Sequence, residues 1–247
     1  MNTANRIAVI DRCKKSGDWE GIAAFLRDGD KGMRRRAARA LGEIGDIRAM
    51  PVLMEATSDP DAWVRLDVVR SLGKLRAAAA TDVLIAALED ENIDIRMETL
   101  HTLGCTKDKR AVGPLVKALS DPHQEIRGGA AEALGRIGWT PAGSREKVLF
   151  LMAKKDWSSL LEVEDLSFDT LYGILSSREE YLRVQAVETL GQTRDERLSW
   201  FLLPMMGDPS RTVRLGAMQA FAGLPGFNAD ETLQALGSVP GKTEVTR

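Results

Sequence analysis

The chain has 247 residues, of which 44% are hydrophobic and 28% are charged, and its formal net charge is −2. This apolar fraction is ordinary for a globular protein and excludes wholesale disorder. Aromatic residues make up only 5%, which favours helices packed through Leu, Ala, Val and Ile. Two cysteines, Cys13 and Cys105, cannot form a disulfide framework, so we expect a reduced, cytoplasmic protein. The N-terminal residues are not followed by an apolar core of signal-peptide length, and no stretch approaches about 18 uncharged apolar residues, so we expect neither a signal peptide nor a membrane-spanning segment.

The first predicted element is a helix over about residues 5–15. It is followed by the sequence Lys14-Lys15-Ser16-Gly17-Asp18-Trp19, in which Asp18 is expected to cap a second, short helix. A similar phrase, Lys154-Lys155-Asp156-Trp157, recurs in the second half of the chain.

A repeated motif then runs along the chain. An aliphatic residue precedes an arginine, and seven residues after the arginine comes Leu or Phe, usually followed by Gly. The arginines are Arg34, Arg65, Arg96, Arg127, Arg183 and Arg214. Successive arginines are 31 residues apart, except for the step of 56 residues between Arg127 and Arg183.

Each arginine lies in a predicted helix with apolar residues at i, i+4 and i+8, as in Val64, Val68 and Leu72. We interpret the Gly that follows Leu as a left-handed residue at the helix C-terminus, and the Asp of Asp-Pro pairs such as Asp59-Pro60 as the N-cap. A second apolar stripe upstream predicts another helix in each repeat. Such a hairpin buries its apolar stripes only when it is stacked on its neighbours.

These motifs resemble HEAT repeats, in particular the armadillo-like subtype named after phycobilisome lyases. Its signature has an Asp six residues before the Arg, then an Ala-rich helix and Leu-Gly. The matching pairs are Asp28–Arg34, Asp59–Arg65, Asp90–Arg96, Asp121–Arg127 and Asp208–Arg214, whereas Ser177 replaces the Asp before Arg183. The resemblance implies an all-α fold, a right-handed α-solenoid of stacked antiparallel helical hairpins. We expect the Asp and Arg columns to form a structural ladder between hairpins, because charge-assisted hydrogen bonds need fixed partners.

We expect a single α-solenoid over residues 1–247, built in two blocks. Block one, 1–138, holds the N-terminal helix and four repeats. An irregular segment, 139–169, contains a predicted helix at 145–155 and is a bend, an insertion or a degenerate repeat. Block two, 170–240, holds two clear repeats and a capping helix near 230–236, and residues 241–247 form a frayed tail.

The resemblance also implies a binding surface on the concave face, at the positions one, two and five residues after each repeat arginine. The same positions include Asp67 and Gln185. The candidate partner-binding residues are Arg35, Arg36, Arg39, Leu66, Arg70, Met97, Glu98, His101, Glu132 and Glu188. Residues 1–40 carry ten Lys or Arg and five Asp or Glu, while residues 156–196 carry three and ten. A face that changes from basic to acidic suits an elongated protein partner or self-association, the alternative being ordinary solvated helix faces.

The favoured function is a non-enzymatic interaction scaffold without a cofactor, with the arginines binding an acidic segment and Glu98, Glu132 and Glu188 a basic one. A bilin lyase or chaperone-like role remains open through the resemblance. Nucleic-acid binding is disfavoured, because the pI is near 5.9 and the basic cluster is confined to one repeat. No metal site is expected, because neither His101 nor His123 is followed by Glu, as in the His-Glu ligand pairs of HEAT-repeat di-iron hydroxylases.

Overall fold

The computed structural model describes residues 2–75, 78–156, 159, 168–194 and 199–224. These residues form helices and their connections, without a strand among them, which confirms the all-α class. The chain divides into two compact units, Met1–Thr140 and Pro141–Arg247. Among the described helices, none combines the length and the apolarity needed to cross a membrane.

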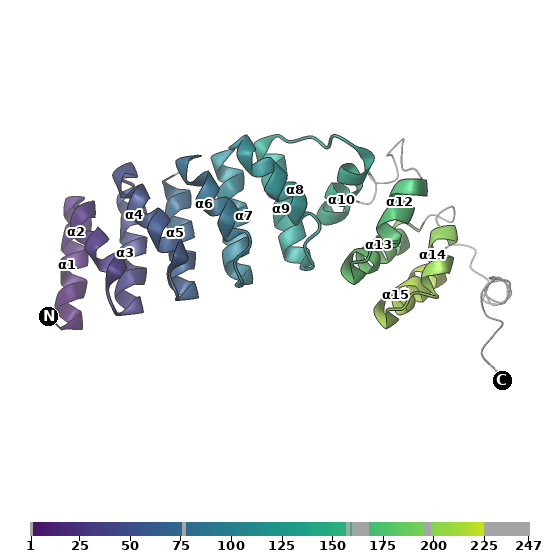
Figure 1. Ribbon diagram of the computed structural model, residues 1–247, viewed down its shortest axis with the longest axis horizontal. Helices are drawn as coiled ribbons and strands as arrows, with labels where there is room; N and C mark the ends of the chain where they lie inside the picture. The colour runs from purple at the N-terminus through teal and green to yellow at the C-terminus, as the bar shows by residue number, and fades with distance from the viewer. Residues whose placement is uncertain (1, 76–77, 157–158, 160–167, 195–198, 225–247) are drawn as a thin grey trace. The chain divides into compact units, whose positions relative to one another are not determined.

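The first unit is a stack of helical hairpins arranged in two rows (Figure 1). One row contains the helices that carry the repeat arginines, here called the arginine helices, preceded by the N-terminal helix α1, and each helix of this row packs against the next. The row consists of α1 (Thr3–Ser16), α3 (Lys31–Ile44), α5 (Ala62–Lys74), α7 (Ile93–Thr106) and α9 (Gln124–Ile137).

The other row contains shorter helices, each of which packs against the arginine helix of its own repeat. They are α2 (Trp19–Ala23), α4 (Met50–Glu55), α6 (Thr81–Ala87) and α8 (Val112–Ala118). Short 3-10 turns extend them: η1 (Ala24–Arg27), η2 (Ile47–Ala49), η3 (Ala56–Ser58), η4 (Ala78–Ala80) and η5 (Lys109–Ala111). The predicted helical hairpin in each repeat is therefore confirmed, and the described chain is an α-solenoid. One helix of each hairpin is long and the other is short.

The core follows the same 31-residue period in both rows. The arginine helices all contribute a fully buried leucine at the same repeat position, namely Leu41, Leu72, Leu103 and Leu134. The shorter helices contribute Ile22, Leu53, Leu84 and Leu115, which are also 0% exposed. Burying such a side chain stabilises the folded state by about 2 kcal/mol, so the repeated apolar positions hold neighbouring hairpins together.

In its described residues, the second unit contains two further hairpins and one leading helix. Its helices are α10 (Ser144–Lys154), α12 (Phe168–Leu175), α13 (Glu180–Thr193), α14 (Ser199–Met205) and α15 (Arg211–Ala222). Helix α13 packs against α12 and α15, and α14 packs against α15. The helix expected at 145–155 corresponds to α10. The expected helix at 230–236 and the tail lie outside the described residues, and the single continuous solenoid stays a prediction.

The glycine after each repeat leucine does not end its helix, which corrects the interpretation made from the sequence. Left-handed glycines occur instead at Gly17, Gly45 and Gly138. Gly42 lies inside α3, where an added Cβ would approach the Cα of Ser71 to 2.8 Å. The corresponding approach of Gly191 to the Cα of Ala220 is 3.0 Å. These glycines are required because neighbouring arginine helices come very close at this level.

The N-cap of α5 lies two residues after the expected position. The side chain of Asp61, not Asp59, accepts hydrogen bonds from the first backbone N–H groups of α5. Asp59 instead accepts from the N–H of Asp61 at 2.9 Å, which shapes the turn before the helix. The carboxylate of Asp59 thereby also accepts hydrogen bonds from Arg34, in the preceding repeat.

Candidate functional site

Each repeat arginine binds the turn that precedes its own helix. In all six repeats, NH1 donates to the backbone carbonyl six residues earlier, at 2.7–2.9 Å. The pairs are Arg34–Asp28, Arg65–Asp59, Arg96–Asp90, Arg127–Asp121, Arg183–Ser177 and Arg214–Asp208. One terminal nitrogen therefore closes the turn, and Nε and NH2 remain for contacts with other groups.

Three of these arginines reach the Asp of the next repeat through two parallel hydrogen bonds, a contact here called a rung. Nε and NH2 of Arg34 lie 2.6 and 2.9 Å from the carboxylate of Asp59. Both other rungs have distances of 2.7 and 3.0 Å. They join Arg65 to Asp90 and Arg183 to Asp208.

The rung between Arg65 and Asp90 lies in a partly buried environment that shifts the pKa of both partners. Burial alone would raise the pKa of Asp90, but hydrogen bonds from Arg65 and from the Asn92 N–H, together with the charges of Arg65 and Arg96, lower it below its usual value. The hydrogen bond with Asp90 raises the pKa of Arg65. Both groups are therefore charged in the folded protein over the physiological range.

Elsewhere the column of arginines makes different contacts. Nδ1 of His123 lies 3.0 Å from a carboxylate oxygen of Asp121 and 3.3 Å from NH2 of Arg96, between the two groups expected to pair. Nε of Arg96 is buried without a hydrogen-bond partner in the described part of the chain. Arg127 donates to Gln124, near the start of its own helix. At the other end, both carboxylate oxygens of Asp28 accept from NH1 of Arg6, at 2.8 Å, and one of them also accepts from the N–H of Asp30.

The predicted binding positions lie on the solvent-facing side of α3, α5, α7 and α9, here called the arginine-helix face. Of the predicted residues in the first unit, most are exposed or partly exposed there: Arg35, Arg36, Arg39, Arg70, Met97, Glu98, His101 and Glu132. The prediction is wrong for Leu66, which is only 4% exposed, and Asp67 and Gln185 are buried as well. The cause is the close approach of neighbouring arginine helices, which places these positions in the seam between two helices.

Most charges assigned to partner binding already have partners within the chain. Nε of Arg70 lies 2.9 Å from Glu98, and NH2 of Arg136 lies 2.6 Å from Glu132. The expected change from basic to acidic along the face is thus offset locally by ion pairs, between adjacent helices for Arg70–Glu98 and within α9 for Arg136–Glu132. A partner for these residues would have to replace existing contacts.

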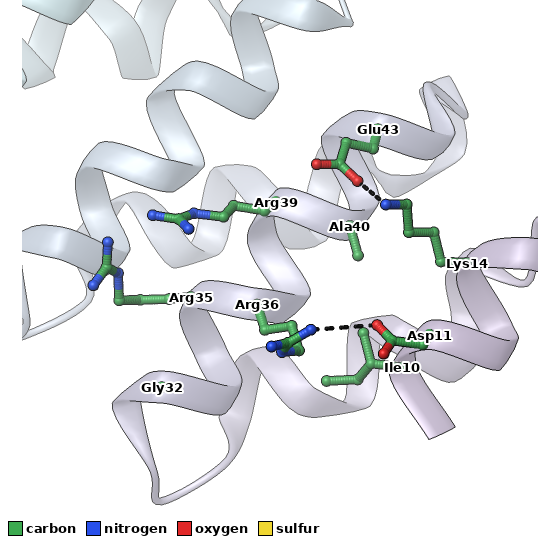
Figure 2. Close-up of a pocket in the computed structure, with 9 residues that line it drawn as sticks. All are labelled: Ile10, Asp11, Lys14, Gly32, Arg35, Arg36, Arg39, Ala40 and Glu43. Atoms are coloured by element: carbon green, nitrogen blue, oxygen red, sulfur yellow. Dashed lines mark hydrogen bonds and ion pairs between the residues drawn. The ribbon is translucent and has the colours of Figure 1, made fainter. Parts of the chain in front are cut away.

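A groove of about 340 Å³ lies between α1 and α3, here called the α1–α3 groove (Figure 2). It is lined by Ile10, Asp11, Lys14, Gly32, Arg35, Arg36, Arg39, Ala40 and Glu43. Figure 2 shows Arg36 directed at Asp11, and Lys14 at Glu43, whereas the guanidinium groups of Arg35 and Arg39 extend away from α1. Four cationic side chains face two carboxylates in this lining, so positive charge is in excess.

Three of the predicted binding residues, Arg35, Arg36 and Arg39, line this groove. Three further charged residues that line it were not predicted from the sequence: Asp11, Lys14 and Glu43. Asp11 and Lys14 belong to α1, which carries no repeat motif and gave no binding signal. Glu43 lies nine residues after Arg34, a spacing that returns to the same side of an α-helix as the positions used in the prediction. The helical period was therefore a usable signal for Glu43.

The second unit has its own groove, of about 610 Å³, between α13 and α15. Glu188 lines it, together with Val184, Leu215 and Gln219. Leu215 is 48% exposed, so this groove presents apolar surface beside polar side chains. Glu188 is thus the one predicted partner-binding residue that belongs to the second unit.

His101 takes part in a small polar cluster on the face. NH1 of Arg136 lies 3.0 Å from its Nδ1, and its Nε2 lies 3.7 Å from the sulfur of Cys105. In the described part of the chain, no group of three or more His, Cys, Asp or Glu side chains is arranged to hold a metal ion.

Comparison with solved structures finds helical repeat proteins. A chain from the complex of CpcE and CpcF of phycocyanin lyase from Nostoc sp. PCC7120 is 22% identical with a TM-score of 0.45, and the match covers 89% of this chain and 94% of that one. Human deoxyhypusine hydroxylase in complex with glycerol is 19% identical with a TM-score of 0.42, over 92% and 91% of the two chains. A computationally designed armadillo repeat protein for modular peptide recognition is 18% identical with a TM-score of 0.40, over 83% and 98%.

Comparison with sequences gives one family. No curated protein matches the chain. The model of HEAT repeats matches residues 20–96 and 81–158. Since these two matches together span more than half of the sequence, and the described residues form stacked helical hairpins, the chain belongs to the HEAT-repeat family.

Proposed function

We propose that the chain is a non-enzymatic interaction scaffold and that its α1–α3 groove binds an acidic segment of a partner protein. The observation that supports this most directly is the excess of cations in the groove lining. Arg36 and Arg39 have side chains that are 45% and 53% exposed, so a partner's carboxylates can reach them. Exposed ion pairs such as Arg36–Asp11 are individually weak, and their exchange for a partner's carboxylate has a small cost.

Charge complementarity of this kind governs association rate and specificity more than affinity. We therefore expect a modest affinity that falls as salt is added, because the groove is open to solvent and its charges are screened. The glutamates on the same face do not form an equivalent site for a basic segment, since Glu98 and Glu132 are already paired with Arg70 and Arg136.

The test is the binding of a short labelled peptide that alternates Glu and Gly, followed by fluorescence anisotropy at low and high NaCl. The double variant Lys14→Glu/Arg36→Glu should reduce affinity at least about ten-fold, because two attractive contacts become repulsive. The matched control is Arg27→Glu/Lys117→Glu, which makes the same charge change at two exposed, ion-paired cations outside the groove.

Equal losses in the two double variants would show that overall charge, not the groove, governs binding. A matching Lys-Gly peptide serves as the opposite-charge control and should not bind. Tighter binding of a short DNA duplex than of the acidic peptide would overturn the proposal in favour of nucleic acid.

A further inference from the structure

A buried carboxylate joins two arginines at the edge of the α1–α3 groove. Asp67, in α5, is 1% exposed. One of its oxygens lies 2.9 Å from Nε of Arg35, and the other lies 2.9 Å from Nε of Arg39. Both arginines belong to α3, four residues apart, so a single carboxylate from the next repeat fixes two guanidinium groups side by side.

The use of Nε leaves the outer edge of each guanidinium available. Within the described residues, NH1 and NH2 of Arg35 and Arg39 have no hydrogen-bond acceptor. A guanidinium recognises a carboxylate through parallel N–H donors, and its affinity rises when the group is held in place beforehand. Two such groups with one buried anion carry a net charge of +1, which matches a single carboxylate.

An exposed aromatic side chain borders this pair. The guanidinium of Arg35 lies over the ring of Trp63, 5.4 Å from its centroid. Trp63 lies in the first turn of α5 and is 53% exposed, an unusual amount for the largest apolar side chain. Trp and Arg are the residues that most often dominate the energetics of protein interfaces.

We propose that Arg35, Arg39 and Trp63 form a carboxylate clamp, in which the two arginines bind one Asp or Glu side chain of the partner and Trp63 packs against the apolar side chain next to it. This inference rests on the proposed function and specifies it: the partner carries an acidic residue adjacent to an apolar one. Asp67 is the positioning residue that orients both arginines without touching the ligand.

The first test separates a clamp from simple charge attraction. Asp67→Asn removes a negative charge, so charge attraction alone predicts tighter binding of an acidic peptide. A clamp that needs Asp67 to hold the guanidinium groups predicts weaker binding, by about five-fold or more. Asp46→Asn, which makes the same charge change beside the exposed Arg48, is the control and should leave the affinity nearly unchanged.

The second test measures the contribution of the aromatic ring, with labelled peptides of equal length and charge that alternate Glu with Leu or Glu with Ser. The clamp predicts about ten-fold tighter binding of the Leu peptide, and loss of this preference in Trp63→Ser. Circular dichroism and urea unfolding of each variant check that the fold is kept.

The outcomes distinguish this inference from the proposed function. If neither peptide binds the wild-type chain even at low salt, the proposed function fails, and the clamp with it. The proposed function is supported if both peptides bind and Lys14→Glu/Arg36→Glu weakens their binding. In that case, tighter binding by Asp67→Asn, or a Leu preference that persists in Trp63→Ser, would show that the clamp is wrong.

Discussion

The rungs give a sharp prediction about stability, because the chain contains its own control. Arg65 and Arg96 occupy equivalent positions, and both donate from NH1 to the carbonyls five and six residues earlier at nearly identical distances. They differ in that Arg65 also holds the carboxylate of Asp90 and lies 3.4 Å from the exposed Glu91, whereas Arg96 meets His123. The difference between Arg65→Ala and Arg96→Ala therefore measures the ion pairs of Arg65, of which the pair with Asp90 is the short and buried one.

The magnitude follows from the burial of the pair. Removing one partner of a fully buried ion pair costs about 3–5 kcal/mol, and an exposed pair contributes less than about 1 kcal/mol. The side chains of Arg65 and Asp90 are both 11% exposed, which lies between these limits but nearer the buried one. We expect Arg65→Ala to lower the free energy of unfolding by about 2 kcal/mol more than Arg96→Ala, equivalent to about 4–8 °C in Tm.

Urea unfolding followed by circular dichroism measures both variants under the same conditions. Arg65→Lys adds a further check, because lysine keeps the charge but cannot form the two parallel hydrogen bonds, so it should recover less than half of the loss. Equal destabilisation by Arg65→Ala and Arg96→Ala would refute the reasoning, since it would show that only the carbonyl contacts contribute.

Three further changes test other features. His123→Ser recreates the Asp-Pro-Ser turn of residues 208–210 and should stabilise the chain by about 1 kcal/mol in urea unfolding, through a helix cap and a restored rung; no gain would argue against this. Gly42→Ala should destabilise by about 1–3 kcal/mol, whereas Gly135→Ala, with nothing within 4 Å, should stabilise by about 1 kcal/mol; equal Tm shifts would contradict the contact argument. The folded-state pKa of Asp90 is lowered, so its contribution to the free energy of unfolding is present above the unfolded pKa of about 3.9 and is lost as the pH falls below that value. Between pH 5 and 3, Arg65→Ala should therefore lose less stability than the wild-type chain does; equal losses would contradict this.

The architecture was predictable because its signals are local. A leucine every 31 residues in two stripes, such as Leu41 with Leu72 and Leu53 with Leu84, fixes both helices of the hairpin and their repetition. The repeat of the Arg and Asp positions also places Arg34, Arg65 and Arg183 opposite the Asp of the next turn. These features need only the helical period and the repeat length.

Contacts that depend on the distance between neighbouring helices were not predictable in this way. Gly42 has the same sequence context as a glycine that ends a helix. The reason a glycine is needed there is the close approach of Ser71, which lies in the next repeat. Asp67 looks like an outward-facing charge from its helical position. It is buried in the seam between α3 and α5, where Arg35 and Arg39 reach it from the other helix.

The candidate site was predictable in part for the same reason. Arg35, Arg36 and Arg39 follow from the repeat register, but Lys14 and Asp11 lie in α1, which has no register to extrapolate from. Trp63 precedes the repeat arginine by two residues, outside the set of positions that the family resemblance supplies. Its role in the proposed clamp emerges only from the position of Arg35 over its ring.

Internal pairing decides what a partner can gain from the arginine-helix face. Where each charge has one counter-ion, as in Arg70–Glu98, a partner exchanges one ion pair for another and the net gain is small. At Asp67 one carboxylate serves two guanidinium groups, so an incoming carboxylate completes the charge balance without displacing a contact. Affinity should therefore concentrate at Arg35 and Arg39 rather than rise with the number of charged residues on the face.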